Sequence, residues 1–232
     1  MRISEIYASL QGEGLLAGTP STFVRTSGCN LRCVWCDTPF TSWAPEGDEM
    51  PLADVLAAVE ALGGRHVVVT GGEPLLFADA AELCVTLRRR GFHVTVETAG
   101  TVLPAIPGPV ADLMSISPKL ASSAPPDDTP RGWRPRHEAA RRRDDVLRAL
   151  AAAGPHQFKF VVDSPDDLAE VRDWLGVLGD AIDRTRVFLM PQGRSSAELA
   201  ARATWLEPEC RRSGYRFAAR HHLAWYGDRR GT

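Results

Sequence analysis

The feature of this sequence that most constrains its fold is the regular alternation of short β-branched runs with amphipathic segments. Apolar residues recur at helical spacing in Pro51–Leu62, and similar patterns cover residues 78–90 and 139–152. A further helix is predicted to begin at Ser164-Pro165, and the last long one covers Ser195–Ser213 and ends at Gly214. The runs typical of strands are Thr22–Arg25, His66–Thr70, His93–Glu97, Leu113–Ser117, Gln157–Val162 and Arg186–Met190.

Repeated strand-then-helix units predict right-handed crossovers and a parallel sheet. Six such strands are too few to close an eight-stranded barrel. We therefore predict an α/β fold with a curved parallel sheet, an open partial (βα)6 TIM-like barrel, as a single domain over residues 1–232. A doubly wound sheet is the main alternative. In either fold, ligands bind at the carboxyl ends of the strands.

Composition narrows the class of protein. The net charge of −2 argues against a general nucleic-acid or membrane-surface binder, and no apolar run is long enough to span a membrane. The beginning, Met1-Arg2-Ile3-Ser4-Glu5, lacks the apolar core of a signal peptide. We therefore expect a cytoplasmic protein with reduced thiols. Cys84 and Cys210 fall in helical patterns and are most simply buried apolar residues.

Three further cysteines, Cys29, Cys33 and Cys36, form a C-x3-C-x2-C loop directly after an apolar strand. A disulfide would leave one of the three thiols unpaired. A structural zinc ion needs four ligands, but the sequence offers no second closely spaced Cys pair and no His in the loop. The pattern therefore favours an iron–sulfur cluster with one iron free of protein ligands, and zinc remains the alternative.

Other polar motifs follow predicted strands. Gly71-Gly72 lets a ligand approach the backbone, and Glu73 then offers a carboxylate to a ligand cation. Glu97-Thr98 ends the predicted strand that begins at His93. Ser117-Pro118-Lys119 ends the predicted strand that begins at Leu113 and supplies a hydroxyl and a cation. Each of these motifs also has an ordinary explanation as a turn or a surface charge.

The segment Gln11-Gly12-Glu13-Gly14 carries amide, backbone and carboxylate groups that suit recognition of a flat heterocycle. Arg25 suits a planar carboxylate through a forked contact. A glycine turn and a structural ion pair are the simpler readings of these two features.

Taken together, the motifs resemble those of the 7-carboxy-7-deazaguanine synthase family within the radical S-adenosylmethionine (SAM) superfamily. The resemblance runs in order over nearly the whole chain, through LQGEG, FVRTSGCNLRCVWCDT, VTGGEPLL, ETAG, SPK, QFKFVV, MPQG and W-x-G-x-x-R-G. It implies a lyase that converts 6-carboxy-5,6,7,8-tetrahydropterin to 7-carboxy-7-deazaguanine with loss of ammonia, in the route to queuosine and other 7-deazapurines. It also implies a 4Fe-4S cluster, S-adenosyl-L-methionine, Mg2+, a homodimer, and flavodoxin or ferredoxin as electron donor.

The same resemblance assigns roles to residues. Cys29, Cys33 and Cys36 hold the cluster, and Thr38 contributes to the Mg2+ site. Leu10, Gln11, Gly12, Arg25 and Thr70 bind the pterin. Trp35, Gly72, Glu73, Ser117, Pro118 and Lys119 bind SAM, although simple loop packing explains Trp35 equally well.

Other segments are less specific. We expect residues 121–136 to form an exposed loop or flap, and Arg141–Arg143 to be a solvated helix face rather than an RNA-binding patch. His221 and His222 are expected in a strand, and the tail 225–232 is expected to close over the substrate. The alternatives to the synthase are another radical SAM enzyme, such as a glycyl-radical activase, and a non-catalytic zinc or iron–sulfur module.

Overall fold

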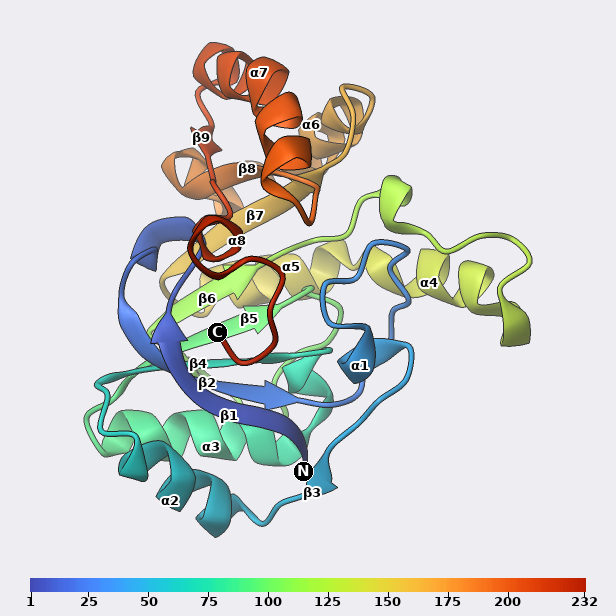
Figure 1. The fold of residues 1–232 in the computed structure, drawn as a ribbon. Coiled ribbons are helices and arrows are strands. Elements are labelled where there is room, and N and C mark those ends of the chain that lie inside the picture. Colours follow the sequence, from blue (N-terminus) through green and yellow to red (C-terminus); the bar gives the residue numbers. More distant parts are fainter.

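The computed structural model describes residues 1–232, apart from the side chain of Ala181, and its strands form one curved, open sheet (Figure 1). The order across the sheet is β3-β1-β2-β4-β5-β6-β7-β8-β9. Neighbours from β2 to β9 are parallel, whereas β1 is antiparallel to β2 and β3. The strands are β1 (Arg2–Leu10), β2 (Pro20–Thr26), β3 (Asp48–Glu49), β4 (His66–Gly71), β5 (His93–Thr98), β6 (Leu113–Ile116), β7 (His156–Val162), β8 (Val187–Pro191) and β9 (Arg216–Phe217).

Helices cover the outer face of this sheet, and α8 with the C-terminal segment crosses in front of its inner face (Figure 1). The α-helices are α1 (Pro39–Ser42), α2 (Leu52–Ala61), α3 (Ala78–Arg89), α4 (Trp133–Arg141), α5 (Asp144–Ala152), α6 (Asp167–Leu178), α7 (Ser196–Ser213) and α8 (His221–Tyr226). Short 3-10 helices cover Gly14–Leu16, Pro74–Leu76, Ala121–Ser123, Pro130–Gly132, Gly179–Ala181 and Arg184–Arg186. None of the helices in the described chain is long and apolar enough to cross a membrane.

The predicted open α/β sheet is confirmed, and the six predicted strands correspond to β2 and β4 through β8. The prediction missed β1, β3 and β9, which extend the sheet at its two edges. In β1 the pairing register with β2 shifts between Ile3 and Glu5. Ile3 and Ile6 therefore pack into the core while Glu5 and Tyr7 reach the inner face, and this break in alternation hid the strand.

Three expectations for the second half of the chain were wrong. The helix predicted over 139–152 is two helices, because Arg142 and Arg143 have extended rather than helical backbone angles. The segment 121–136 is not wholly a loop, since α4 begins at Trp133. His221 and His222 lie in α8 rather than in a strand.

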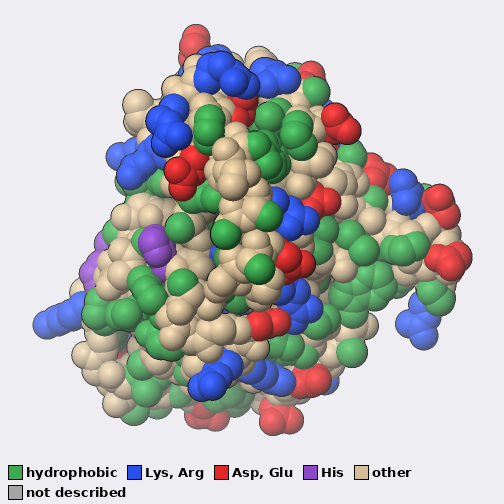
Figure 2. Space-filling model, turned by 45° about the horizontal axis from the view of Figure 1, so that its top comes forward, with side chains coloured by type: hydrophobic (Ala, Val, Ile, Leu, Met, Phe, Trp, Pro, Cys, Tyr) green, Lys and Arg blue, Asp and Glu red, His purple; other side chains and the backbone are tan. Residues whose placement is uncertain are grey.

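Arg141, Arg142 and Arg143 do not form a free basic face. Arg141 pairs with Glu138 and with Glu170 of α6, and Arg142 lies 2.6 Å from Asp173. Figure 2 likewise shows basic and acidic side chains interspersed on the face that it presents. Cys84 in α3 and Cys210 in α7 are buried, as predicted.

Successive side chains of each strand point to opposite faces of the sheet, so core residues alternate with residues that reach the inner face. In β7, Phe158 and Phe160 are fully buried in the main core, and the Phe160 ring contacts Trp174 of α6 edge-on at 6.2 Å. Lys159, between the two phenylalanines, points to the opposite side of the sheet because successive side chains of a strand alternate. The same alternation sets Arg25 opposite Val24 and Thr70 opposite Val69.

Candidate active site

A cavity of about 500 Å3 lies on the inner face of the sheet at the carboxyl ends of the strands. Arg25 from β2, Thr70 from β4, Glu97 from β5 and Lys159 from β7 all reach it. Parallel strands bring these residues together although the chain separates them widely. Ligands of open α/β folds bind at this position.

Cys29, Cys33 and Cys36 line one wall of this cavity and pack in a single group with Leu31. Cys29 Sγ accepts a hydrogen bond from the backbone N–H of Leu31 at 3.4 Å, and Cys36 Sγ lies 3.2 Å from Ser42 Oγ. Within the described part of the chain, no three His, Cys, Asp or Glu side chains converge as ligands for a single ion. Three cysteine side chains on one wall of a cavity can supply three thiolate ligands to an iron–sulfur cluster.

Burial raises the pKa of Cys29 to about 12 and that of Cys33 to about 11. Both side chains are therefore neutral thiols in the absence of metal. A bound cluster supplies the positive charge that holds such groups as thiolates, so loading of iron is coupled to proton release.

The glycine pair after β4 packs directly on the cysteine loop. A Cβ at Gly72 would lie 2.2 Å from the carbonyl oxygen of Gly28 and 2.8 Å from Cβ of Cys29. The backbone N–H of Glu73 donates to that same carbonyl oxygen at 2.9 Å. Only a glycine allows this close approach, which brings the backbone of residue 72 to the wall that carries the thiols.

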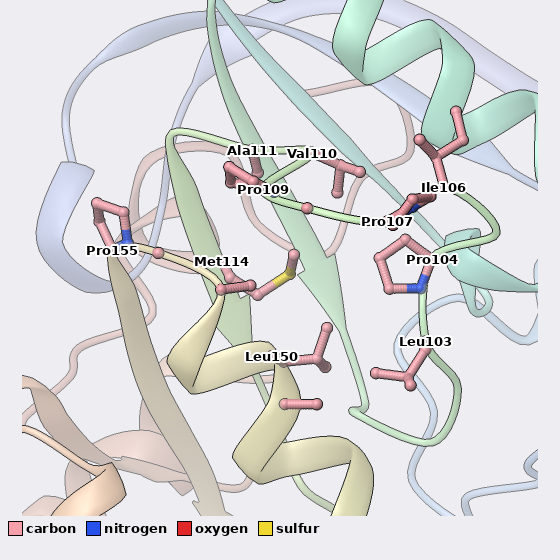
Figure 3. Close-up of a pocket in the computed structure, with 14 residues that line it drawn as sticks. Leu103, Pro104, Ile106, Pro107, Pro109, Val110, Ala111, Met114, Leu150 and Pro155 are labelled. Carbon is pink, nitrogen blue, oxygen red and sulfur yellow. The ribbon is translucent and has the colours of Figure 1, made fainter.

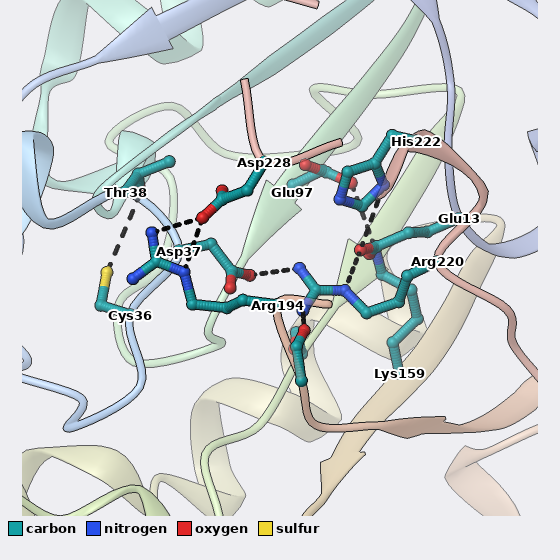
Figure 4. Close-up of polar contacts among 12 residues, drawn as sticks. Glu13, Cys36, Asp37, Thr38, Glu97, Lys159, Arg194, Arg220, His222 and Asp228 are labelled. Atoms are coloured by element: carbon teal, nitrogen blue, oxygen red, sulfur yellow. Dashed lines mark hydrogen bonds and ion pairs between the residues drawn. The ribbon is translucent and has the colours of Figure 1, made fainter. Parts of the chain in front are cut away.

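Charged side chains from distant parts of the chain also meet at this cavity (Figure 4). Lys159 Nζ lies 2.9 Å from Glu13 and 3.1 Å from Glu97, and its side chain is 4% exposed. Arg220 Nε lies 3.3 Å from Glu13, and its Nη2 lies 2.5 Å from Asp37. This network joins the turn after β1, the strands β5 and β7, the cysteine loop and the residue before α8.

Each charge in this network shifts the pKa of its neighbours. Burial has the largest single effect and would raise the pKa values of Glu13 and Glu97. The Lys159 cation and further favourable partners, Arg220 for Glu13 and the Thr70 hydroxyl for Glu97, together lower both pKa values. Burial would lower the pKa of Lys159, but the two carboxylates outweigh it and raise that pKa above its usual range. At neutral pH the cavity wall therefore carries two carboxylates and at least one ammonium group.

Arg25 stands at the β1 side of the cavity. Its Nε lies 3.0 Å from Glu5, and its Nη2 donates to the Tyr7 hydroxyl at 2.7 Å. The Tyr7 ring stacks on Phe23 at 5.2 Å. These contacts hold the plane of the guanidinium group while it lines the cavity, which prepares it for a planar anion.

Polar groups near the thiols can meet a second ligand. Lys119 Nζ donates to Ser117 Oγ at 2.8 Å, and both residues line the cavity. Trp35 also lines it, and its buried indole N–H has no hydrogen-bond partner within the described structure. A buried donor at a cavity wall is most simply explained by a polar ligand atom that completes its bond.

The C-terminal segment closes part of the cavity. Asp228 accepts hydrogen bonds from Arg194 at 2.7–3.0 Å, and Arg230 pairs with Glu46 at 2.8 Å and also with Glu5. Glu5 thus contacts both Arg230 and Arg25. Residues 227–232 line the cavity, and the covering of a bound substrate by this tail stays a prediction.

Most of the residues predicted for the site line this one cavity, and two do not. Glu73 is fully buried, and its carboxylate accepts hydrogen bonds from Thr98 Oγ1 and from the backbone N–H groups of Leu75 and Ala99. These bonds hold the turn after β4 against β5, and the role of Glu73 in binding SAM stays a prediction. Pro118 is buried in the turn after β6. The residues that line the cavity as expected are Leu10, Gln11, Gly12, Arg25, Cys29, Cys33, Trp35, Cys36, Thr38, Thr70, Gly72, Ser117 and Lys119.

Sequence reasoning missed Lys159, Arg220, Arg194 and Asp37 as parts of this site, and it favoured a strand for His222, which lines the cavity from α8. A signal existed for Lys159, since a lone cation between two phenylalanines in a strand must face the other side of the sheet. No local pattern marks Arg220 or His222. A Cβ at Gly12 would lie 2.3 Å from His222 Nδ1, a proximity that only the folded chain reveals.

A second pocket, of about 200 Å3, lies between α5 and the loop before β6 (Figure 3). Leu103, Ile106, Met114 and Leu150 contribute to its walls, which contain no charged side chain. It lacks groups for acid–base, metal or redox chemistry. The larger polar cavity is therefore the candidate active site.

The fold and the cysteine-lined cavity define the class of this protein. A family model described as the radical SAM superfamily matches residues 23–121, a range that contains the three cysteines, the glycine pair and Ser117–Lys119. The structure superposes on the crystal structure of QueE from Escherichia coli with a TM-score of 0.71 and 25% identity, over 95% of this chain and 94% of that one. Streptococcus suis SuiB shares the fold alone, at 16% identity and a TM-score of 0.53.

Sequence relatives narrow the class further. The chain is 47% identical to a 7-carboxy-7-deazaguanine synthase of Rhodopirellula baltica, over 99% of this chain and 88% of the relative. It is also 47% identical to one of Halobacterium salinarum, over 97% of this chain and 90% of the relative. The chain belongs to the 7-carboxy-7-deazaguanine synthase family of the radical SAM superfamily. The family predicted from the sequence motifs is confirmed.

Proposed function

We propose that this protein converts 6-carboxy-5,6,7,8-tetrahydropterin to 7-carboxy-7-deazaguanine and ammonia, as a carbon–nitrogen lyase that serves queuosine or other 7-deazapurine biosynthesis. The observation that carries the proposal is a single cavity that joins three thiols to Arg25 and to the carboxylates of Glu13 and Glu97. The near full-length relatives, which bear the name of this synthase, support the same assignment. They do not favour a glycyl-radical activase.

Membership of the family implies a 4Fe-4S cluster and S-adenosyl-L-methionine. Cys29, Cys33 and Cys36 fit the cluster, and Trp35, Gly72, Ser117 and Lys119 line the adjoining wall that would hold SAM. When bound, the cluster and SAM supply reductive carbon–sulfur cleavage and hydrogen-atom abstraction. The protein contributes binding, orientation and the exclusion of water.

Leu10, Gln11, Gly12 and Thr70 line the part of the cavity that we assign to the pterin ring. The ring presents amino and N–H donors, which the nearby carboxylates of Glu13 and Glu97 can accept. Arg25 stands ready for the substrate carboxylate, because Glu5 and Tyr7 already hold its guanidinium plane. Fixing both ends of the substrate presents one reactive carbon to the SAM-binding wall.

Thr38 is the residue that we assign to Mg2+. Its Oγ1 accepts a hydrogen bond from Thr41 at 3.0 Å and lines the cavity two residues beyond Cys36. Mg2+ commonly takes one or two protein ligands and fills its octahedron with substrate and water oxygens. A single hydroxyl at the cavity wall is compatible with that mode of binding.

Four further assignments complete the proposal. We infer one domain over residues 1–232, because the main core runs continuously from Met1 to Cys210. The cytoplasm suits three thiols that must stay reduced to bind iron. A homodimer, and flavodoxin or ferredoxin as the electron donor, rest on the family resemblance alone.

Anaerobic reconstitution with iron and sulfide, followed by assay with the carboxypterin, SAM, Mg2+ and dithionite, tests the function. We expect 7-carboxy-7-deazaguanine and ammonia in equal amounts, and neither product from a Cys33→Ala control. Cleavage of SAM without conversion of the pterin would favour the activase. A colourless protein without an electron paramagnetic resonance (EPR) signal would point to a zinc module.

A further inference from the structure

The segment 121–141, here called the insert, belongs to none of the sequence motifs and packs behind the cysteine loop. His137 of α4 is fully buried, with 0% exposure. Its Nδ1 accepts a hydrogen bond from the backbone N–H of Arg32, within the cysteine loop, at 3.2 Å. Its Nε2 lies 3.0 Å from Ser123 Oγ.

The hydrogen bonds around His137 determine which tautomer it adopts. Ser123 Oγ donates to the carbonyl oxygen of Leu120 at 2.6 Å, so its oxygen accepts the proton on His137 Nε2. Nδ1 is then free to accept from Arg32 N–H. Burial lowers the pKa of His137 to about 4, so the ring is neutral and matches this pattern at physiological pH. The relay leads from the cysteine loop to the residue directly after Lys119.

Two further contacts tie the insert to the same loop. The backbone N–H of Val34 donates to the carbonyl oxygen of Ser123 at 2.9 Å. The Arg32 guanidinium lies 3.9 Å from the centre of the Trp133 ring and donates to the carbonyl oxygen of Cys29 at 2.9 Å. The loop between Cys29 and Cys36 is therefore held from behind by the insert as well as from the front by Gly72.

We propose that His137 is a positioning residue that holds the cluster-binding loop in register with Ser117–Lys119, and so aligns the cluster with SAM. This proposal rests on the proposed function for the roles of those two segments. Its physical basis is that His137 supplies the acceptor for Arg32 N–H and, through Ser123, a rigid connection to the end of β6. Without that acceptor the buried N–H loses its partner, and the loop gains freedom to move away from the SAM-binding wall.

Three variants separate the two ends of this relay. His137→Phe keeps the ring volume but removes both nitrogens. His137→Asn places an amide oxygen near the position of Nδ1, so it can still accept from Arg32. Ser123→Ala leaves the bond to Arg32 intact and breaks the connection to Leu120. His93→Phe makes the same chemical change at the first residue of β5, the end of the strand away from the cavity, and serves as the matched control.

The readouts are the rate of iron loss from the reconstituted protein to a chelator under argon, the dissociation constant of SAM, and the EPR spectrum of the reduced cluster with and without SAM. For His137→Phe we expect about tenfold faster iron loss and about tenfold weaker SAM binding, the effect of one unpaired buried donor. His137→Asn should lose iron at a rate within about threefold of that of the wild type, because its amide oxygen can still accept the hydrogen bond from Arg32. Ser123→Ala should retain iron but weaken SAM binding and broaden the SAM-dependent EPR change.

The proposal is overturned if His137→Phe matches the wild type, if His137→Asn loses iron as fast as His137→Phe, or if His93→Phe shows the same losses. Should His137→Phe fail to fold, wild-type SAM binding in Ser123→Ala would overturn it independently. A wild-type protein that forms no 4Fe-4S cluster would instead defeat the proposed function. Normal conversion of the pterin by all variants would defeat only the role of His137.

Discussion

Replacing Lys159 with methionine measures how strongly the buried charges of the active site depend on one another. Lys159 Nζ lies within hydrogen-bonding distance of Glu13 and Glu97, and the side chain is 4% exposed. Methionine fills a similar volume without a charge. The variant therefore leaves two half-buried carboxylates with fewer partners while the fold around them stays packed.

The magnitude follows from the contacts that remain. Removing one partner of a buried ion pair costs about 3–5 kcal/mol of unfolding free energy. Glu13 keeps Arg220 Nε at 3.3 Å, and Glu97 keeps the Thr70 hydroxyl at 2.9 Å. We therefore expect Lys159→Met to lose about 3 kcal/mol of unfolding free energy, the lower end of that range. For a chain of this size the loss corresponds to a melting temperature lower by about 6–12 °C.

The loss of stability in Lys159→Met is expected to depend on pH, because all three charged groups titrate. In the wild type, the pKa values of Glu13 and Glu97 lie below their unfolded values, so their pairing stabilises the fold above about pH 4.3 and is lost as the pH falls through the folded values. The raised pKa of Lys159 keeps its contribution in place up to about pH 10.4, and it is lost as the pH rises through the folded value. In the variant, burial raises the pKa of Glu97 without the opposing cation, so its carboxylate takes up a proton more readily. The stability difference between variant and wild type should therefore be smaller at pH 5 than at pH 8.

Urea unfolding of both proteins without cluster, at pH 5 and pH 8, provides the measurement. Lys119→Met is the matched control, because Lys119 lines the same cavity but is paired only with the Ser117 hydroxyl, and we expect it to cost less than about 1 kcal/mol. A loss below about 1 kcal/mol in Lys159→Met, an equal loss in the control, or a difference independent of pH would refute this account of the network.

Three other substitutions test separate parts of the site. Arg25→Lys keeps the charge but loses the planar fork, so kcat/KM for the pterin should fall about 10- to 100-fold in anaerobic kinetics while the dissociation constant of SAM stays unchanged; a loss of SAM affinity instead would contradict the assignment. Gly72→Ala forces a Cβ to within 2.2 Å of the Gly28 carbonyl oxygen, so iron content after reconstitution should drop and unfolding free energy should fall by about 1–3 kcal/mol, and normal values for both would disprove the close approach. Thr38→Val should abolish any stimulation of turnover by Mg2+ without changing iron content, whereas unchanged stimulation would remove Thr38 from the Mg2+ site.

Much of the fold could be predicted from local pattern. The six predicted strands are present, and the helix predicted from Ser195 begins there with a capping box formed by Ser195 and Glu198. Such features depend on residues a few positions apart, which the sequence displays directly. The strand β1 escaped prediction because its change of register sends Glu5 and Tyr7 to the cavity and interrupts the apolar alternation.

The motifs of the site were equally local. The C-x3-C-x2-C loop, the glycine pair and Ser117–Lys119 each follow a strand, so a parallel sheet brings them to one edge. Glu73 shows the limit of this reasoning. A carboxylate directly after a glycine pair looks available to a ligand, but in the fold it accepts hydrogen bonds from Thr98 and from backbone N–H groups and is fully buried.

By itself, the sequence determined the six strands β2 and β4 to β8, most of the helices between them, the cluster-binding loop and the family, because each is encoded in short runs of neighbouring residues. Only the tertiary structure decided which charges meet. Glu13 and Lys159 are 146 positions apart, and Asp37 and Arg220 are 183 apart. Ion pairs over such separations arise from the curvature of the sheet and the path of the tail, which depend on packing across the whole molecule rather than on any local pattern.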